Sequence, residues 1–204
     1  MTVALDESAI IWSAPEGERA GRPLLLAFHG HHGDEHQLAV AAQALPPHIV
    51  VATPRAPYRE PGGWSWFELA ESGRTQADQA VDAVLAWLDR QPAFSSIGLL
   101  GLSQGSAVAL NVLRRDPARF AYVVQLSGFS IDTSPMPELA ALRLPAFSAH
   151  GDRDTVIPTD LVMETSRWLH EHTALVERRY PLLDHSVDPQ ELLEAAAFIA
   201  AHAR

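Results

Sequence analysis

The feature that most constrains the fold is the alternation of short apolar runs with amphipathic segments. Apolar runs of strand length, bounded by turn residues, occur at 24–28, 49–52, 97–100, 122–126, 146–149 and 175–180. Segments with helical periodicity lie between or after these runs, at about 75–90, 104–114, 159–170 and 189–201. Strands that are apolar on both faces and joined by helices predict an α/β fold, with a mostly parallel central sheet and helices on both faces.

The length and composition predict a single domain that spans residues 1–204. Hydrophobic residues make up 47% of the chain and charged residues 20%, which is typical of globular proteins and excludes a disordered or coiled-coil chain. In such folds the functional loops lie at the carboxyl ends of the strands, so motifs are sought there.

The charged residues exclude several classes of function. The 15 basic residues against 25 acidic ones give a net charge of -10, which argues against a nucleic-acid partner. There is no Lys for Schiff-base chemistry or a P-loop, and no Cys for a thiolate nucleophile or a disulfide. The N-terminal residues lack a signal-peptide pattern, and no apolar stretch approaches the ~20 residues of a membrane span. We therefore expect a cytoplasmic protein without a membrane span.

A nucleophile motif follows the apolar run at 97–100. The chain continues as Gly101-Leu102-Ser103-Gln104-Gly105 into a helical segment, which is the strand, tight turn and helix that a Gly-x-Ser-x-Gly elbow requires. Glycines allow neighbouring backbone to approach closely at so sharp a turn. The pattern predicts that Ser103 projects into a cleft and that the N–H of Gln104, at a helix start, stabilises an oxyanion.

A serine nucleophile needs a histidine base and an acid that orients it, in the chain order Ser, acid, His for such an elbow. After the run at 146–149, the acid loop contains both Asp152 and Asp154. After the run at 175–180 comes His185. All three positions follow strands, so the residues are expected to meet at one edge of the sheet.

Together these segments resemble the α/β-hydrolase fold, and within it the small bacterial carboxylesterase/phospholipase family related to acyl-protein thioesterases. The resemblance covers nearly the whole chain. It rests on the elbow and on three further motifs: His-Gly-His-His-Gly-Asp at 29–34, His-Gly-Asp-Arg-Asp-Thr-Val-Ile-Pro at 150–158, and His-Ser-Val-Asp-Pro-Gln-Glu at 185–191. The family implies no cofactor and no metal.

The resemblance implies a role for each matching residue. Ser103 is the expected nucleophile and His185 the general base, and the family's spacing selects Asp154 over Asp152 as the orienting acid. The expected oxyanion hole is formed by the main-chain N–H groups of His31 and Gln104. One departure is Asp184, which stands where the family has Gly before its catalytic His.

Aromatic residues near these motifs are candidates for substrate contact. Trp66 and Phe67 resemble the family's Trp-Phe segment, which lines the acyl pocket, and Phe129 follows Ser127-Gly128. Core packing is an equally good explanation for each ring. With no obvious lid insertion, an open cleft for short to medium acyl chains is expected.

The same positions also allow other interpretations. The histidines at 29, 31, 32 and 36 do not fit a metallo-β-lactamase motif, which needs Asp and His where Gly33 and Asp34 stand, so no metal is expected. The favoured function is a serine hydrolase acting on a small-molecule carboxylic ester or thioester. The alternatives are a serine peptidase or amidase with the same triad, and a noncatalytic binding protein on the same scaffold.

Overall fold

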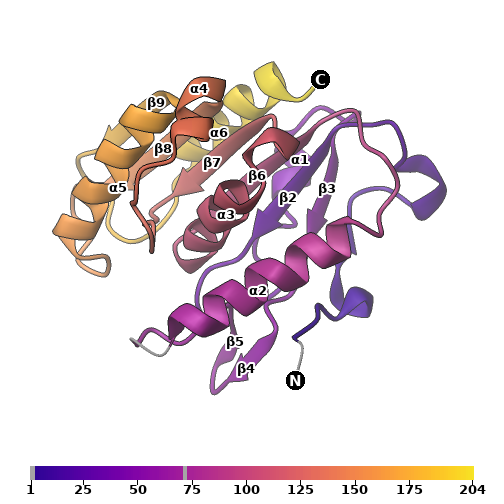
Figure 1. Cartoon of the computed structure of the whole chain (residues 1–204), viewed down its shortest axis with the longest axis horizontal. Coiled ribbons are helices and arrows are strands. Elements are labelled where there is room, and N and C mark those ends of the chain that lie inside the picture. Colours follow the sequence, from indigo (N-terminus) through magenta and orange to yellow (C-terminus); the bar gives the residue numbers. More distant parts are fainter. Residues whose placement is uncertain (1–2, 71–72) are drawn as a thin grey trace.

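A seven-stranded sheet runs through the middle of the molecule in the order β1-β3-β2-β6-β7-β8-β9 (Figure 1). The computed structural model describes residues 3–70 and 73–204. Strand β1 lies antiparallel to β3 at one edge, and the other neighbouring strands pair in parallel. The strands are Ile11–Trp12 (β1), Leu24–Phe28 (β2), Val50–Thr53 (β3), Ile97–Leu102 (β6), Tyr122–Leu126 (β7), Pro145–Gly151 (β8) and Ala174–Tyr180 (β9).

Helices cover both faces of this sheet (Figure 1). One face packs against α2 (Gly73–Leu88), α3 (Gln104–Arg115), α4 (Pro137–Leu142) and α5 (Thr159–His172). The other packs against α1 (Ala41–Ala44) and α6 (Pro189–His202). Short 3₁₀ helices occupy Glu7–Ala9, Glu16–Glu18 and Pro117–Arg119.

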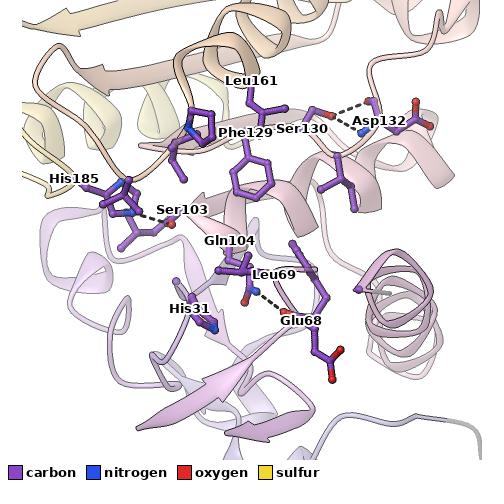
Figure 2. Close-up of a pocket in the computed structure, with 18 of the residues that line it drawn as sticks. His31, Glu68, Leu69, Ser103, Gln104, Phe129, Ser130, Asp132, Leu161 and His185 are labelled. Carbon is purple, nitrogen blue, oxygen red and sulfur yellow. Dashed lines mark hydrogen bonds between the residues drawn. The ribbon is translucent and has the colours of Figure 1, made fainter. Parts of the chain in front are cut away.

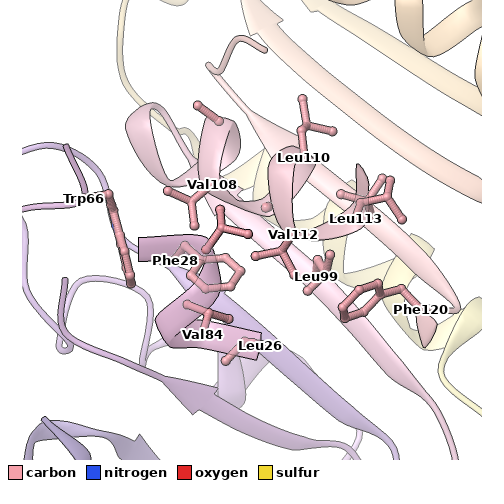
Figure 3. Packing of buried hydrophobic residues seen from close by; sticks show 14 of the residues in the cluster. Leu26, Phe28, Trp66, Val84, Leu99, Val108, Leu110, Val112, Leu113 and Phe120 are labelled. Atoms are coloured by element: carbon pink, nitrogen blue, oxygen red, sulfur yellow. The ribbon is translucent and has the colours of Figure 1, made fainter. Parts of the chain in front are cut away.

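The central strand β2 shows why the sequence folds this way. Side chains of a strand alternate between the two faces of a sheet. Leu24, Leu26 and Phe28 join the core under α2 and α3, whereas Leu25 and Ala27 join the core under α6. All five are fully buried, which explains the continuous apolar run. Figure 3 shows the larger core, in which Leu26 and Phe28 pack beside Val84, Leu99 and Val112.

The structure confirms the α/β-hydrolase fold that the sequence predicts, and it adds short elements that the sequence did not predict. Besides β1, α1 and α4, these are β4 (Tyr58–Glu60) and β5 (Gly63–Ser65), which pair antiparallel. Strands this short are below the length at which alternating hydrophobicity is informative. The hairpin lies apart from the main sheet, beside the end of α2 in Figure 1.

None of the helices in the described part of the chain is long and apolar enough to cross a membrane.

Candidate active site

Ser103 occupies a strained turn between β6 and α3. Its φ of 52° and ψ of -117° lie in a region that residues other than glycine rarely adopt. The Ser103 N–H donates to the carbonyl of Leu126 at the end of β7, 2.9 Å away, which fixes the turn against the neighbouring strand. The side chain consequently faces the cavity beyond the carboxyl ends of the strands.

The two glycines of the elbow are required by close backbone contacts. A Cβ on Gly101 would lie 2.4 Å from the carbonyl oxygen of Gly105, and a Cβ on Gly105 would lie 2.1 Å from that of Phe28. Real Cβ atoms do not approach backbone this closely. The glycines therefore let the start of α3 pack against the end of β2.

The imidazole of His185 lies between the hydroxyl of Ser103 and the carboxylate of Asp154. Figure 2 shows its hydrogen bond with Ser103. Its Nε2 is 2.9 Å from Ser103 Oγ, and its Nδ1 is 2.7 Å from Asp154 Oδ2. With the Nδ1–H donating to the carboxylate, Nε2 is free to accept the hydroxyl proton. The arrangement can activate a serine oxygen as a nucleophile.

Asp154 is held in its ionised form by its surroundings. Its side chain is fully buried, and burial alone would raise its pKa. Hydrogen bonds from His185 and from the main-chain N–H groups of Val156 and Ile157 outweigh that effect and keep the pKa below its usual value. His150, which is also buried, places its Nε2 3.1 Å from the same carboxylate oxygen that faces His185.

Two further acidic residues close to the motifs, Asp152 and Asp184, lie elsewhere. Asp152 forms an ion pair with Arg179, and its side chain is 42% exposed. Asp184 is exposed and accepts a hydrogen bond from the hydroxyl of Ser186 at 2.5 Å. The structure thus brings Asp154, and neither Asp152 nor Asp184, to the imidazole of His185.

His31 and Gln104 both line the cavity beside Ser103. Among the described residues, no acceptor is found for the main-chain N–H of either. Gln104 is the first residue of α3, where main-chain N–H groups have no partner within the helix. Both N–H groups are therefore available to a developing negative charge on a bound substrate.

The loop that carries His31 is anchored by the buried His29. Its Nδ1 lies 2.7 Å from the carbonyl of Gly30, and its Nε2 accepts the N–H of Ala56. Burial lowers the pKa of His29 and outweighs the hydrogen bond to Gly30, so the ring is neutral and suited to these two contacts. Periodicity gives no sign of this role, because Ala56 follows a different strand.

The side chain of Gln104 has a structural role that the sequence did not reveal. It is buried, its Oε1 accepts the N–H of Trp66, and its Nε2 donates to the carbonyl of Phe67. These bonds hold the segment after β5 against the start of α3.

Phe67 lines the cavity as expected, but Trp66 does not. Trp66 is fully buried, packs edge-on against Phe28 and donates its indole N–H to the carbonyl of His29, so its place is in the core.

The cavity has a volume of about 1170 Å³. Phe129, in the segment after β7, points into it near Leu161 (Figure 2). At its rim, Leu69 and Val156 are 64% and 60% exposed. The cavity therefore offers apolar surface on the side away from His31.

Comparisons with known proteins show which proteins this chain is similar to in sequence and fold. The sequence profile of the phospholipase/carboxylesterase family matches residues 13–203. Acyl-protein thioesterase 1 of Debaryomyces hansenii is 30% identical over 168 residues, which are 72% of this chain and 72% of that protein. Among solved structures, acyl-protein thioesterase 2 of Zea mays has a TM-score of 0.77 at 22% identity, covering 95% of this chain and 98% of that one. The carboxylesterase of Bacillus cereus has a TM-score of 0.76 at 17% identity, covering 95% and 93%.

Proposed function

The chain belongs to the phospholipase/carboxylesterase family of α/β-hydrolases, and from this premise we propose that it cleaves carboxylic esters or thioesters through an acyl-enzyme on Ser103. Family membership makes the protein a hydrolase of the carboxylesterase and acyl-protein thioesterase kind. One observation supports these residue roles: hydrogen bonds join Ser103 to His185 and His185 to Asp154, and the first two residues line the cavity.

In the proposed reaction, Ser103 Oγ attacks the carbonyl carbon of the substrate while Nε2 of His185 takes the hydroxyl proton. The main-chain N–H groups of His31 and Gln104 stabilise the oxyanion of the tetrahedral intermediate. Its collapse expels the alcohol or thiol, which leaves with the proton held by His185, and the acyl group stays on Ser103. A water molecule then attacks this ester while His185 takes its proton, and His185 returns a proton to Ser103 Oγ as the carboxylic acid leaves.

We assign the acyl group to the apolar side of the cavity. Phe67, Phe129 and Leu161 line the cavity, and none of them carries a charge. A short to medium acyl chain would bury its methylene groups there, each gaining about 0.8 kcal/mol. Thioesters are included as substrates because the sequence relatives are named acyl-protein thioesterases.

The proposal is tested with p-nitrophenyl esters from acetate to decanoate and with a matching series of acyl thioesters. Wild type is expected to hydrolyse short and medium chains. Ser103→Ala is expected to lose at least three orders of magnitude in kcat, as removal of a triad nucleophile does. Turnover of peptide or amide substrates in place of esters would favour the peptidase alternative.

Labelling by a fluorophosphonate probe identifies the nucleophile directly. Wild type is expected to be labelled once, at Ser103, and Ser103→Ala not at all. Ser186→Ala is the matched control, because Ser186 also lines the cavity but bonds to Asp184; it should label like wild type. Absence of both turnover and labelling in the wild type would overturn the proposal and favour the noncatalytic binding protein.

A further inference from the structure

Two adjacent histidines and one glutamate meet outside the triad. Nε2 of His31 lies 3.0 Å, and Nε2 of His32 lies 3.1 Å, from the same carboxylate oxygen of Glu60. The side chains are 27%, 45% and 24% exposed, so the group lies near the surface and is accessible to solvent. Glu60 ends β4, and the histidines belong to the loop after β2.

An unusual backbone brings the two imidazoles together. Successive side chains of an extended chain point to opposite sides. His32 instead has a φ of 60°, a left-handed conformation that is uncommon for residues other than glycine. The two rings stack with centroids 3.8 Å apart and planes 27° apart, and both present Nε2 to Glu60.

The hairpin that supplies Glu60 is fixed to the histidine loop. The N–H of Trp64 donates to the carbonyl of Gly33 at 3.1 Å. Gly63 lies so close that a Cβ on it would be 2.1 Å from the carbonyl oxygen of His32. The two histidines and the carboxylate are therefore held in place by backbone contacts of their own.

This set of donors suits a divalent transition-metal ion. Two imidazole nitrogens and a carboxylate oxygen are a ligand set that Zn²⁺ takes in proteins, usually with a water as fourth ligand. Ligand atoms of a tetrahedral Zn²⁺ lie about 3.3 Å apart for bonds of about 2.0–2.1 Å. The separations of 3.0 and 3.1 Å between the nitrogens and the carboxylate oxygen are close to that spacing.

The surroundings leave room for an ion. A surface cavity of about 760 Å³, lined by His32, Arg59, Glu60 and Trp64 among others, lies beside the group. The guanidinium of Arg59 is placed over the ring of Trp64.

We propose that His31, His32 and Glu60 bind one divalent transition-metal ion, with Zn²⁺ the best match, beside the active-site cavity. The spacing of the histidines along the chain does not indicate such a site, because Glu60 lies 28 residues beyond His32 and joins the histidines only in the folded chain. The site is independent of the proposed hydrolysis, although His31 also lines the active-site cavity.

Equilibrium dialysis of the untagged protein against ZnCl₂ tests the site. Wild type is expected to bind one Zn²⁺ per chain. His32→Ala and Glu60→Gln are expected to weaken binding at least tenfold. His36→Ala is the matched control, because His36 is an exposed histidine of the same loop near Asp34 and Glu35; its affinity should equal that of wild type.

The control also decides the opposite outcome. Binding that survives both His32→Ala and Glu60→Gln, or that falls only in His36→Ala, would overturn the assignment, as would a wild type that binds no Zn²⁺. Thermal unfolding without metal shows whether each variant is folded. Substituting Co²⁺ gives an independent readout, because visible absorption bands typical of four-coordinate Co²⁺ are expected in the wild type and not in Glu60→Gln. None of these measurements depends on ester hydrolysis, so they fail separately from the proposed function.

Discussion

Asp154 and Asp152 belong to the same loop after β8, but only Asp154 faces His185. In the proposed mechanism, the carboxylate of Asp154 keeps the proton of His185 on Nδ1, which leaves Nε2 free to act as the base. Asp154→Asn is expected to reverse this tautomer and lower kcat by about 10³- to 10⁴-fold, with little change in KM. Steady-state kinetics on the best ester substrate measures the effect.

Asp152→Asn is the matched control, because it makes the same chemical change in the same loop. It removes only an ion pair with Arg179 that is exposed to solvent, and such pairs contribute little. Its kcat should stay within about twofold of wild type. If Asp152→Asn lost as much activity as Asp154→Asn, the assignment of the acid would be wrong.

At the scale of single residues, the sequence is a better guide to residues that directly follow a strand than to how an individual side chain packs. Ser103, Asp154 and His185 are recognisable because each follows a predicted strand within a short motif. Trp66 belongs to the Trp-Phe segment that was a candidate for substrate contact, yet its ring lies in the core. Its orientation depends on the hydrogen bond between its N–H and the side chain of Gln104, 38 residues away, which no local pattern reveals.

At the scale of elements, the elbow depends on how closely α3 approaches β2. Gly105→Ala would place a Cβ 2.1 Å from the carbonyl oxygen of Phe28 and 2.5 Å from that of His29. Because neither atom belongs to a flexible side chain, α3 would have to move. We expect a loss of about 1–3 kcal/mol in the free energy of unfolding, as for overpacked cores, together with lower kcat. Urea unfolding measures the first and ester hydrolysis the second.

Gly17→Ala makes the same change where a Cβ would meet nothing within 4 Å. It should leave both the unfolding free energy and kcat near the wild-type values. Equal stability of the two variants would contradict the steric explanation of the elbow.

The elements also show where prediction from the sequence stopped. The long strands and the four longest helices were predicted because apolar runs and helical periodicity extend over many residues. The β4–β5 hairpin was not predicted, because its strands have three residues each and are held by a turn and by the bridge from Trp64 to Gly33. The Glu60 that we propose as a metal ligand lies in this hairpin.

For the whole molecule, the pH dependence of stability depends on a buried carboxyl group at the end of the motif at 185–191. Glu191, in the first turn of α6, is fully buried, and neither of its carboxylate oxygens has a hydrogen-bond partner among the described residues. Burial raises its pKa from 4.5 to about 7. Between these two values the unfolded chain loses this proton while the folded protein keeps it, so the free energy of unfolding falls as pH rises.

Glu191→Gln removes this titration without changing the shape of the side chain. Below pH 4.5 the group is protonated in both states and contributes no difference, whereas above pH 7 the folded wild type carries a buried charge. A shift of this size corresponds to about 3 kcal/mol. Relative to wild type, the unfolding free energy of Glu191→Gln should therefore rise by up to about 3 kcal/mol between pH 5 and pH 8, measured by urea unfolding at each pH. Glu171→Gln, the same change at an exposed position, is the control and should run parallel to wild type. A constant offset between Glu191→Gln and wild type across this range would mean that Glu191 does not titrate between the two states as its burial requires.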